Sequence, residues 1–177
     1  MENNKDKDDR ARRAAEIQSL PARYVELGEP MDKKAAEVAV RVFGEMKNDN
    51  DGRRAILPVD SVGKILRHRG YELSRIIKSI PELYKTSLFG WSERENVRPG
   101  HKEHPNIKEY HNYINKFTDG DGEYYIRFTV NEETAKPNRV GRNIVHSAAV
   151  SDITLRKAAT RNVSGLLTRA KRARRHS

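Results

Sequence analysis

The stretch HNYINKFTDGDGEYYIRFTV, residues 111–130, decides the fold. Two segments rich in aromatic and β-branched residues flank TDGDG, whose Asp-Gly pairs favour a tight turn. This pattern predicts two antiparallel strands joined as a hairpin. The segment NIVHSAAVSDI, residues 143–153, follows a polar loop and predicts a third strand of the same sheet.

The hairpin strands divide their side chains between two faces, because successive residues of a strand point in opposite directions. In residues 123–130 the even-numbered positions are aromatic or aliphatic, and we expect them to face the core. Arg127 falls on the other face, where an arginine either keeps the sheet soluble or binds phosphate. His146 in the third segment is in register with apolar residues, which predicts that it faces the core.

Helical periodicity precedes the strands. The clearest helix is predicted over residues 31–47, with Asp32 as its N-cap. Its apolar stripe is expected to comprise Ala35, Val38, Ala39, Val42, Phe43 and Met46. The polar run at residues 48–52 is predicted to be a turn, since its spacing does not match a calcium-binding loop.

Two further helices are predicted over residues 60–69 and 72–86, and Pro81 is expected to kink or split the second. The apolar face of that second helix is expected to comprise Leu73, Ile76, Ile77, Ile80, Leu83 and Tyr84. Residues 90–104 are predicted to be a loop. Helices followed by strands predict an α+β fold, with N-terminal helices packed on one face of a small antiparallel β-sheet.

The chain divides into a globular domain and two terminal segments. Its 177 residues suit one domain with tails. Residues 31–153 are predicted to form the α+β domain, and residues 1–30 a disordered or weakly helical segment. Residues 154–177 are predicted to form a basic tail that is helical, with the helical signal at residues 154–170, or disordered.

The net charge of +10 comes largely from the C-terminal end, since no acidic residue follows Asp152. A cationic tail either stays solvated and disordered or attracts phosphate backbones without reading their sequence. The expected nucleic-acid-binding residues are Lys116 in the sheet and, further along the chain, Arg156, Lys157, Arg161, Arg169, Lys171, Arg172, Arg174 and Arg175.

Several classes of site are excluded by the sequence. The absence of cysteine excludes disulfides and cysteine-ligated metals, and neither glycine-rich nucleotide motif is present. His101, His104 and His111 could supply imidazoles to zinc, but no HExxH pattern accompanies them. We therefore predict no metal and no cofactor.

Metal-free acid–base chemistry on RNA remains. Cleavage through the 2′-hydroxyl needs a base, an acid and a cation that stabilises the phosphate. Histidine and arginine supply these groups at neutral pH. The candidate catalytic residues are His68, His111, Arg127, His146 and Ser147. We expect them to converge on one pocket that faces solvent.

The order of these motifs resembles a known group of domains. The motifs are KILRHR (residues 64–69), IPEL (80–83), a Tyr/His-rich strand, YYIRFTV (124–130) and VHSAAVSDI (145–153). Over residues 59–153 the chain resembles domains of phage and mobile-element polyvalent proteins, which resemble in turn the barnase/EndoU/colicin/RelE-like nuclease fold. The resemblance implies a metal-independent ribonuclease site on the open sheet face. It implies that a helix contributes His68 and that the strands contribute His111, Arg127, and His146 with Ser147.

Three functions remain open. The first is a phage-derived ribonuclease or toxin-like domain, with an immunity protein as a partner. The second is a non-enzymatic inhibitor of a host defence complex, similar to anti-CRISPR or anti-restriction proteins, that binds protein or nucleic acid through a basic surface. The third is a structural, virion-associated protein. We expect RNA as the favoured partner, no membrane contact, and a cytoplasmic location in the bacterial host cell, since the chain starts without an apolar signal.

Overall fold

The predicted hairpin forms the centre of the protein. The structure, a computed structural model, describes residues 4–67, 73–93, 107–133 and 148–158. β5 (Ile107–Thr118) and β6 (Glu123–Glu133) pair antiparallel along their whole lengths. In the turn between them, Asp119 Oδ1 accepts hydrogen bonds from the backbone amides of Asp121 and Gly122. The hairpin prediction is confirmed.

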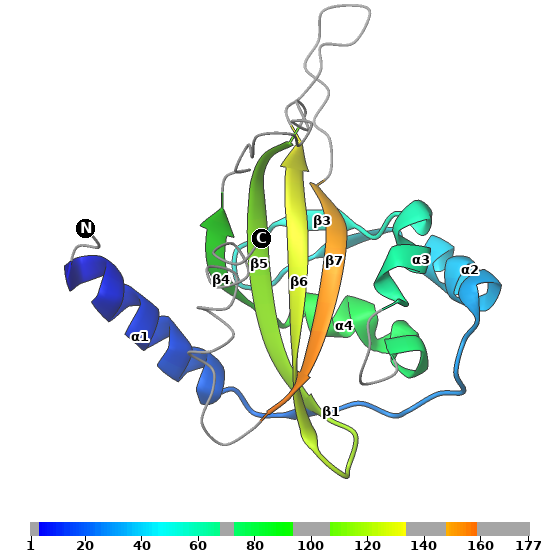
Figure 1. The fold of residues 1–177 in the computed structure, drawn as a ribbon, viewed down its shortest axis with the longest axis horizontal. Helices are drawn as coiled ribbons and strands as arrows, with labels where there is room; N and C mark the ends of the chain where they lie inside the picture. The colour runs from blue at the N-terminus through cyan, green and yellow to red at the C-terminus, as the bar shows by residue number, and fades with distance from the viewer. Residues whose placement is uncertain (1–3, 68–72, 94–106, 134–147, 159–177) are drawn as a thin grey trace, which may run out of the picture.

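Within these residues, seven strands form one mixed, curled sheet, in the order β1-β5-β6-β7-β3-β2, with β4 also paired to β5 (Figure 1). The other strands are β1 (Arg23–Tyr24), β2 (Glu45–Lys47), β3 (Arg54–Ile56), β4 (Leu88–Glu93) and β7 (Ala148–Lys157). The expectation of a wholly antiparallel sheet is wrong at two places, because β1 runs parallel to β5 and β3 runs parallel to β7. Parallel partners need long connections, and a local sequence pattern does not report such pairings.

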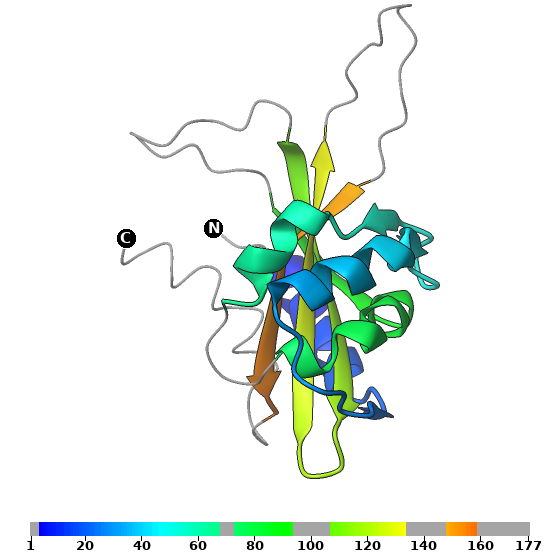
Figure 2. The same cartoon turned by 90° about the vertical axis from the view of Figure 1, so that its right-hand side faces the viewer.

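Helices α2, α3 and α4 cover one face of the sheet and lie in front of the long strands in Figure 2. Their bounds are α2 (Lys33–Phe43), α3 (Val62–Ile65) and α4 (Ile80–Lys85), with the 3₁₀ turns η1 (Val59–Ser61), η2 (Leu73–Arg75) and η3 (Ile77–Ser79) between α2 and α4. Phe128, Val130 and Ile153 are fully buried on this face and belong to the main core. The α+β class and the predicted core positions of β6 are confirmed.

Helix α1 (Asn4–Gln18) lies on the opposite face of the sheet. There Ile17 packs with Ile114 and Tyr125 in a second, smaller apolar cluster. The segment expected to be disordered or weakly helical therefore contains a helix with a tertiary contact. No helix within the described residues is long and apolar enough to cross a membrane.

Helix α2 is shorter than predicted, and its apolar stripe has a different phase. Asp32 Oδ1 accepts a hydrogen bond from the amide three residues further on, at 2.8 Å, so the predicted N-cap is confirmed. Ala36 and Val40 face the core, whereas the predicted stripe residues Val38 and Val42 are exposed. The predicted C-terminal end of this helix is strand β2.

The helix predicted over residues 72–86 is split into η2, η3 and α4, and Pro81 lies in the first turn of α4. Proline is well accommodated there, because the first turn of a helix has no partner for its amide. All six apolar residues predicted for this segment are buried. Within the described residues, the helix predicted over residues 60–69 is limited to η1 and α3.

Strand β7 continues to Lys157, so residues 154–157 are strand and do not begin the predicted helix. The ladder extends because Tyr124 and Tyr125 of β6 pair with Lys157 and Arg156. Residues 143–147 of the predicted third strand and the tail beyond residue 158 lie outside the described residues.

Candidate acid–base site

Two of the predicted catalytic residues, His111 and Arg127, lie in the part of the chain that the structure describes, and they do not share a face of the sheet. His111 pairs with Val130 of the main core, whereas Arg127 pairs with Ile114 of the cluster beneath α1. His111 and Arg127 therefore point to opposite faces, and the expected convergence is wrong for this pair. His68, His146 and Ser147 lie outside the described residues.

Arg127 is held within the fold. Its Nη2 donates to Thr154 Oγ1 at 3.2 Å, and its guanidinium carbon lies 5.9 Å from the centre of the Trp91 ring. Burial lowers the pKa of Arg127, although the nearby carboxylates of Asp152 and Glu93 act to raise it. The buried Nε of Arg127 makes no hydrogen bond. These contacts favour a packing role over an open phosphate clamp.

Lys116 also has structural partners. Its Nζ donates to the carbonyl oxygens of Gln18 and Leu20, at 2.9 and 3.2 Å, and so holds the C-terminal end of α1. Arg156 and Lys157 lie at the end of β7. The other predicted nucleic-acid-binding residues, Arg161, Arg169, Lys171, Arg172, Arg174 and Arg175, lie outside the described residues.

A chain of hydrogen bonds runs through His111 on the core face of the sheet. The ring Nδ1 lies 2.6 Å from Ser92 Oγ, and Nε2 lies 2.8 Å from Glu132 Oε2. These residues come from the neighbouring strands β4, β5 and β6. The imidazole is only 4% exposed, whereas Ser92 is exposed and the Glu132 side chain is 36% exposed. A buried ring thus joins a hydroxyl and a carboxylate that both reach solvent.

Ser92 reaches this face because β4 is bulged. The β4–β5 register shifts after Phe89 and leaves Gly90 as an extra residue. Regular alternation would place Ser92 on the face opposite Phe89, and the bulge turns it towards His111 instead. A Cβ at Gly90 would lie 3.2 Å from the carbonyl oxygen of Asn112, so this close approach favours glycine.

Further polar groups extend the chain. Arg53 Nη1 lies 3.6 Å from Glu132 Oε2, and Arg53 Nε donates to the Tyr113 hydroxyl at 2.8 Å. The Tyr113 hydroxyl donates in turn to Asp51 Oδ2 at 2.5 Å. The connected side chains, which we call the acid–base network, are Asp51, Arg53, Ser92, His111, Tyr113 and Glu132.

Burial and mutual contacts fix the charges at the inner end of the network. Burial and the hydrogen bond to Asp51 raise the pKa of Tyr113 far above its ordinary value, so its hydroxyl stays protonated. Burial by itself lowers the pKa of Arg53, but Tyr113, Glu132 and Asp51 together raise it above the ordinary value. A permanent cation therefore stands beside Glu132.

The turn before β3 positions Asp51 and Arg53, and its anchor is the buried Asn48. The side-chain amide of Asn48 donates to the carbonyl oxygens of Tyr84 and Ser87 at 2.8 and 2.9 Å. Its Oδ1 accepts hydrogen bonds from two amides of the turn itself. The predicted turn is confirmed, and these bonds dock it onto the end of α4.

The carboxylate of Glu132 determines which nitrogen of His111 carries the proton. An ionised carboxylate only accepts hydrogen bonds, so the neutral ring presents Nε2–H to Glu132. The lone pair of Nδ1 then accepts the Ser92 hydroxyl proton. In the charged ring, Nδ1–H donates to Ser92, whose own proton becomes free to leave. The pair can therefore move a proton in either direction between the buried ring and solvent.

Glu109 also approaches the ring, with Oε2 at 3.8 Å from His111 Nε2. One ligand atom from each of Glu109, His111 and Glu132 lies within 4.8 Å of the others, which is close enough to hold a metal ion. Arg53 stands beside Glu132, and its positive charge opposes a second cation at this place. Acid–base chemistry by the side chains themselves fits the charges better.

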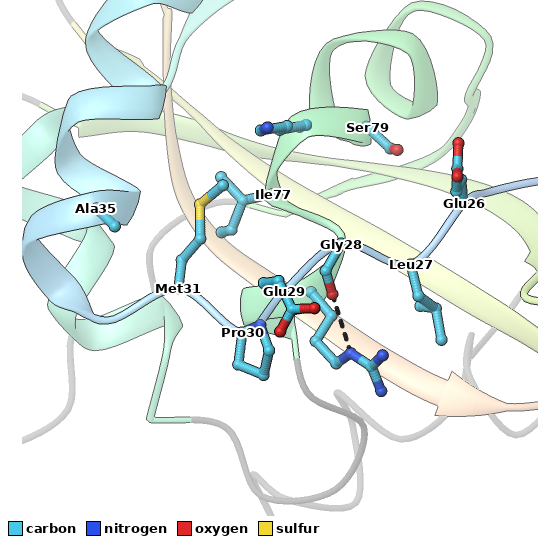
Figure 3. A pocket seen from close by; sticks show the side chains of 11 residues that line it. Glu26, Leu27, Gly28, Glu29, Pro30, Met31, Ala35, Ile77 and Ser79 are labelled. Atoms are coloured by element: carbon cyan, nitrogen blue, oxygen red, sulfur yellow. Dashed lines mark hydrogen bonds between the residues drawn. The ribbon is translucent and has the colours of Figure 1, made fainter.

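A separate pocket of about 590 Å³ lies between residues 26–31 and η3 (Figure 3). Arg75 Nε donates to the carbonyl oxygen of Gly28 at 3.1 Å and holds one wall in place. None of the described residues that line this pocket is a histidine or belongs to the acid–base network. The pocket therefore lacks the proton-transfer groups found around His111.

Sequence patterns single out only one residue of the network, His111. Ser92 falls in residues 90–104, which are predicted to be a loop, and Arg53 follows a turn without any local motif. Glu132 lies beyond Val130, the predicted end of its strand. Alternation continued by one step would have placed Glu132 on the face of Val130, so the sequence did contain a signal for this residue.

The described residues thus define an α+β domain with a histidine-centred network at one end of its sheet. The chain belongs to the family described as large polyvalent protein-associated domain 3, whose model matches residues 31–145. The match includes every residue of the network and excludes α1. The expected kinship with polyvalent-protein domains is confirmed. No curated protein and no solved structure gives a significant match.

Proposed function

We propose that this chain is a metal-independent ribonuclease that cleaves RNA phosphodiesters at the acid–base network. One observation carries the proposal: His111 lies between Ser92 and Glu132, and Arg53 lies 3.6 Å from the same carboxylate. These groups supply a proton donor, a proton acceptor and a fixed cation, which the reaction requires. The chemistry is the one that the sequence predicts, but its place moves from the Arg127 face to the core face.

Arg53 binds the scissile phosphate in this proposal. Its guanidinium is permanently charged and can contact two phosphate oxygens at once. Its side chain is 30% exposed, so an anion can reach it. Binding at this position brings the phosphate next to Glu132 and stabilises the negative charge that develops in the transition state.

Glu132 and the Ser92–His111 pair move the protons. Glu132 accepts the proton of the 2′-hydroxyl, whose oxygen attacks phosphorus. Ser92 donates its proton to the departing 5′-oxygen and receives the Nδ1 proton of the charged His111 ring. The products are a 2′,3′-cyclic phosphate and a 5′-hydroxyl, and exchange with solvent restores the starting protonation states.

Two sequence features support the choice of RNA. Residues 59–153 resemble polyvalent-protein domains, which resemble in turn the barnase/EndoU/colicin/RelE-like nuclease fold, and that resemblance implies the same metal-free chemistry. The basic residues that follow Asp152 add an attraction for phosphate backbones that does not depend on base sequence.

The test is incubation of the purified full chain with total RNA in excess EDTA, followed by analysis of fragment ends. We expect fragments that end in 2′,3′-cyclic phosphate. Glu132→Gln should slow cleavage by about 10²–10⁴-fold. The matched control is Glu123→Gln, which changes an exposed glutamate at the other end of the same strand and should leave the rate unchanged. Intact RNA at high protein concentration, or equal rates for the two variants, contradicts the proposal.

RNA that is bound but not cleaved would favour the second predicted function, inhibition of a host defence complex. Such binding should depend on the basic tail. Deletion of residues 159–177 should then weaken it, and affinity should fall steeply with salt concentration.

A further inference from the structure

We infer that Ser92 is a nucleophile that forms a covalent ester with the phosphoryl group of a phosphodiester. This activity goes beyond the proposed cleavage of RNA, in which the attacking oxygen belongs to the substrate. It would extend the substrate class to phosphodiesters without a 2′-hydroxyl. The inference rests on the geometry of Ser92, His111 and Glu132 and does not require that RNA is a substrate.

The hydrogen bonds around His111 have the order that an activated hydroxyl requires. Glu132 accepts from Nε2–H at 2.8 Å, which leaves Nδ1 as the acceptor for Ser92 Oγ–H at 2.6 Å. A hydroxyl becomes a good nucleophile when a base takes its proton and a third group orients the base. Arg53 Nη1 lies 3.6 Å from Glu132 Oε2, so a positive charge stands beside the carboxylate that orients the ring.

The exposure of the three groups fits nucleophilic attack. The ring of His111 is 4% exposed, so bulk water does not compete for Nδ1, while Ser92 is exposed and an electrophile can approach its Oγ. An exposed serine can bond to water and has no need of a buried partner. The hydrogen bond to His111 is therefore not needed to satisfy the Ser92 hydroxyl, and it fits a role in activating that hydroxyl.

The backbone is also adapted to this placement. Without the bulge at Gly90, regular alternation would turn Ser92 away from His111. Bulges occur often beside active sites, where they redirect a side chain. A Cβ at Gly90 would lie 3.2 Å from the carbonyl oxygen of Asn112, a tight contact that favours glycine at the bulge.

The reaction balances with water as the only co-reactant. Ser92 Oγ attacks phosphorus while its proton passes to Nδ1, and the bond from phosphorus to the leaving oxygen breaks as the ring returns that proton to it. A water molecule then attacks the seryl phosphodiester and gives its proton to Nδ1. The Ser92 oxygen leaves with this proton, so a phosphodiester and water become a phosphomonoester and an alcohol.

The test uses an alkyl fluorophosphonate, a phosphoryl electrophile from which Oγ displaces fluoride. The full chain is incubated with the reagent, and the modified residue and its rate are determined by peptide mass spectrometry. We expect Ser92 to be labelled on the order of 10²-fold or more faster than the exposed Ser19 of the same chain. Ser92→Ala should remove the adduct.

Two further variants test the role of the ring and its carboxylate. His111→Gln should abolish labelling, and Glu132→Gln should slow it by on the order of 10²-fold or more. Circular dichroism checks that each variant is folded, and Glu132→Gln keeps the test decisive if the buried His111 variant unfolds. Labelling of Ser92 no faster than of Ser19, or at the wild-type rate in folded Glu132→Gln, overturns the inference.

The outcomes also separate this inference from the proposed ribonuclease. Rapid labelling of Ser92 by a protein that leaves RNA intact supports the nucleophile and contradicts the ribonuclease. RNA cleavage by a protein whose Ser92 does not react supports the ribonuclease and overturns the nucleophile.

Discussion

The two faces of the sheet use their charged residues in different ways. Beneath α1, Lys116 donates a hydrogen bond to the C-terminal end of that helix, and Arg127 donates one to Thr154. Both cations therefore have a structural role. On the core face, Arg53 and His111 both contact the carboxylate of Glu132. The groups that a basic residue of the sheet contacts therefore indicate whether its role is structural or functional. On the core face the partners are groups that can exchange protons, and this difference locates the candidate site.

The largest expected effect separates the two arginines. Arg53→Gln should slow RNA cleavage by about 10²–10³-fold, because it removes the fixed cation at the phosphate. Arg127→Gln should leave the rate within a few-fold of wild type, since Arg127 faces the other way. Single-turnover cleavage assays measure both rates. Equal losses in the two variants would remove the distinction between the faces.

The anchor of the turn should matter for stability as well. Asn48→Ala leaves the buried carbonyl oxygens of Tyr84 and Ser87 with fewer donors, and we expect a loss of about 2–4 kcal/mol in the free energy of unfolding. Urea denaturation measures this value. Asn50→Ala is the matched control: Asn50 is exposed and also bonds to Ser87, so its replacement should cost about 1 kcal/mol or less. A larger loss of stability for Asn50→Ala than for Asn48→Ala would contradict the conclusion that Asn48 anchors the turn.

Alkaline pH should destabilise the core face. Burial raises the pKa of Tyr84 and Tyr113 far above the ordinary value of 10.0. Above pH 10 the unfolded chain therefore ionises these tyrosines while the folded chain does not, and stability falls as pH rises. Each contributes a loss of about 1.4 kcal/mol per pH unit in that range. Urea midpoints between pH 9 and pH 11 measure the slope, and the loss should be smaller in Tyr84→Phe. A flat profile would mean that both hydroxyls ionise in the folded protein.

The smallest effect is expected beneath α1. Lys116→Met keeps most of the apolar stem but loses the bonds to Gln18 and Leu20, which should cost about 1 kcal/mol of stability. Thermal unfolding measures this loss. RNA cleavage should not change. A strong loss of cleavage in this folded variant would indicate that the catalytic site lies on the Lys116 face of the sheet, and would contradict its placement on the core face.

The hairpin, its two faces and the cap of α2 could be predicted, because their signals are local. Alternation in β6 placed Ile126, Phe128 and Val130 in the core, and Asp32 stood at the correct distance before α2. The phase of α2 could not be fixed in the same way, because Val38 and Val42 suggest an apolar face that the fold leaves exposed.

The acid–base network could not be assembled from sequence, because its members come from four separate segments. The face of Ser92 depends on one extra residue at Gly90, and the position of Arg53 depends on how Asn48 docks on α4. Both depend on tertiary contacts, which local sequence patterns do not report. Glu132 is the exception, since one more step of alternation along β6 reaches it from Val130.

The ring of His111 offers a decisive observation. Two-dimensional ¹H–¹⁵N NMR of the histidine side chains reveals which ring nitrogen carries the proton when the imidazole is neutral. We predict a single Nε2–H tautomer for His111 in the full chain, and loss of this preference in Glu132→Gln. An Nδ1–H tautomer, or the rapidly exchanging mixture of a free imidazole, would contradict the hydrogen-bond chain from Ser92 to Glu132.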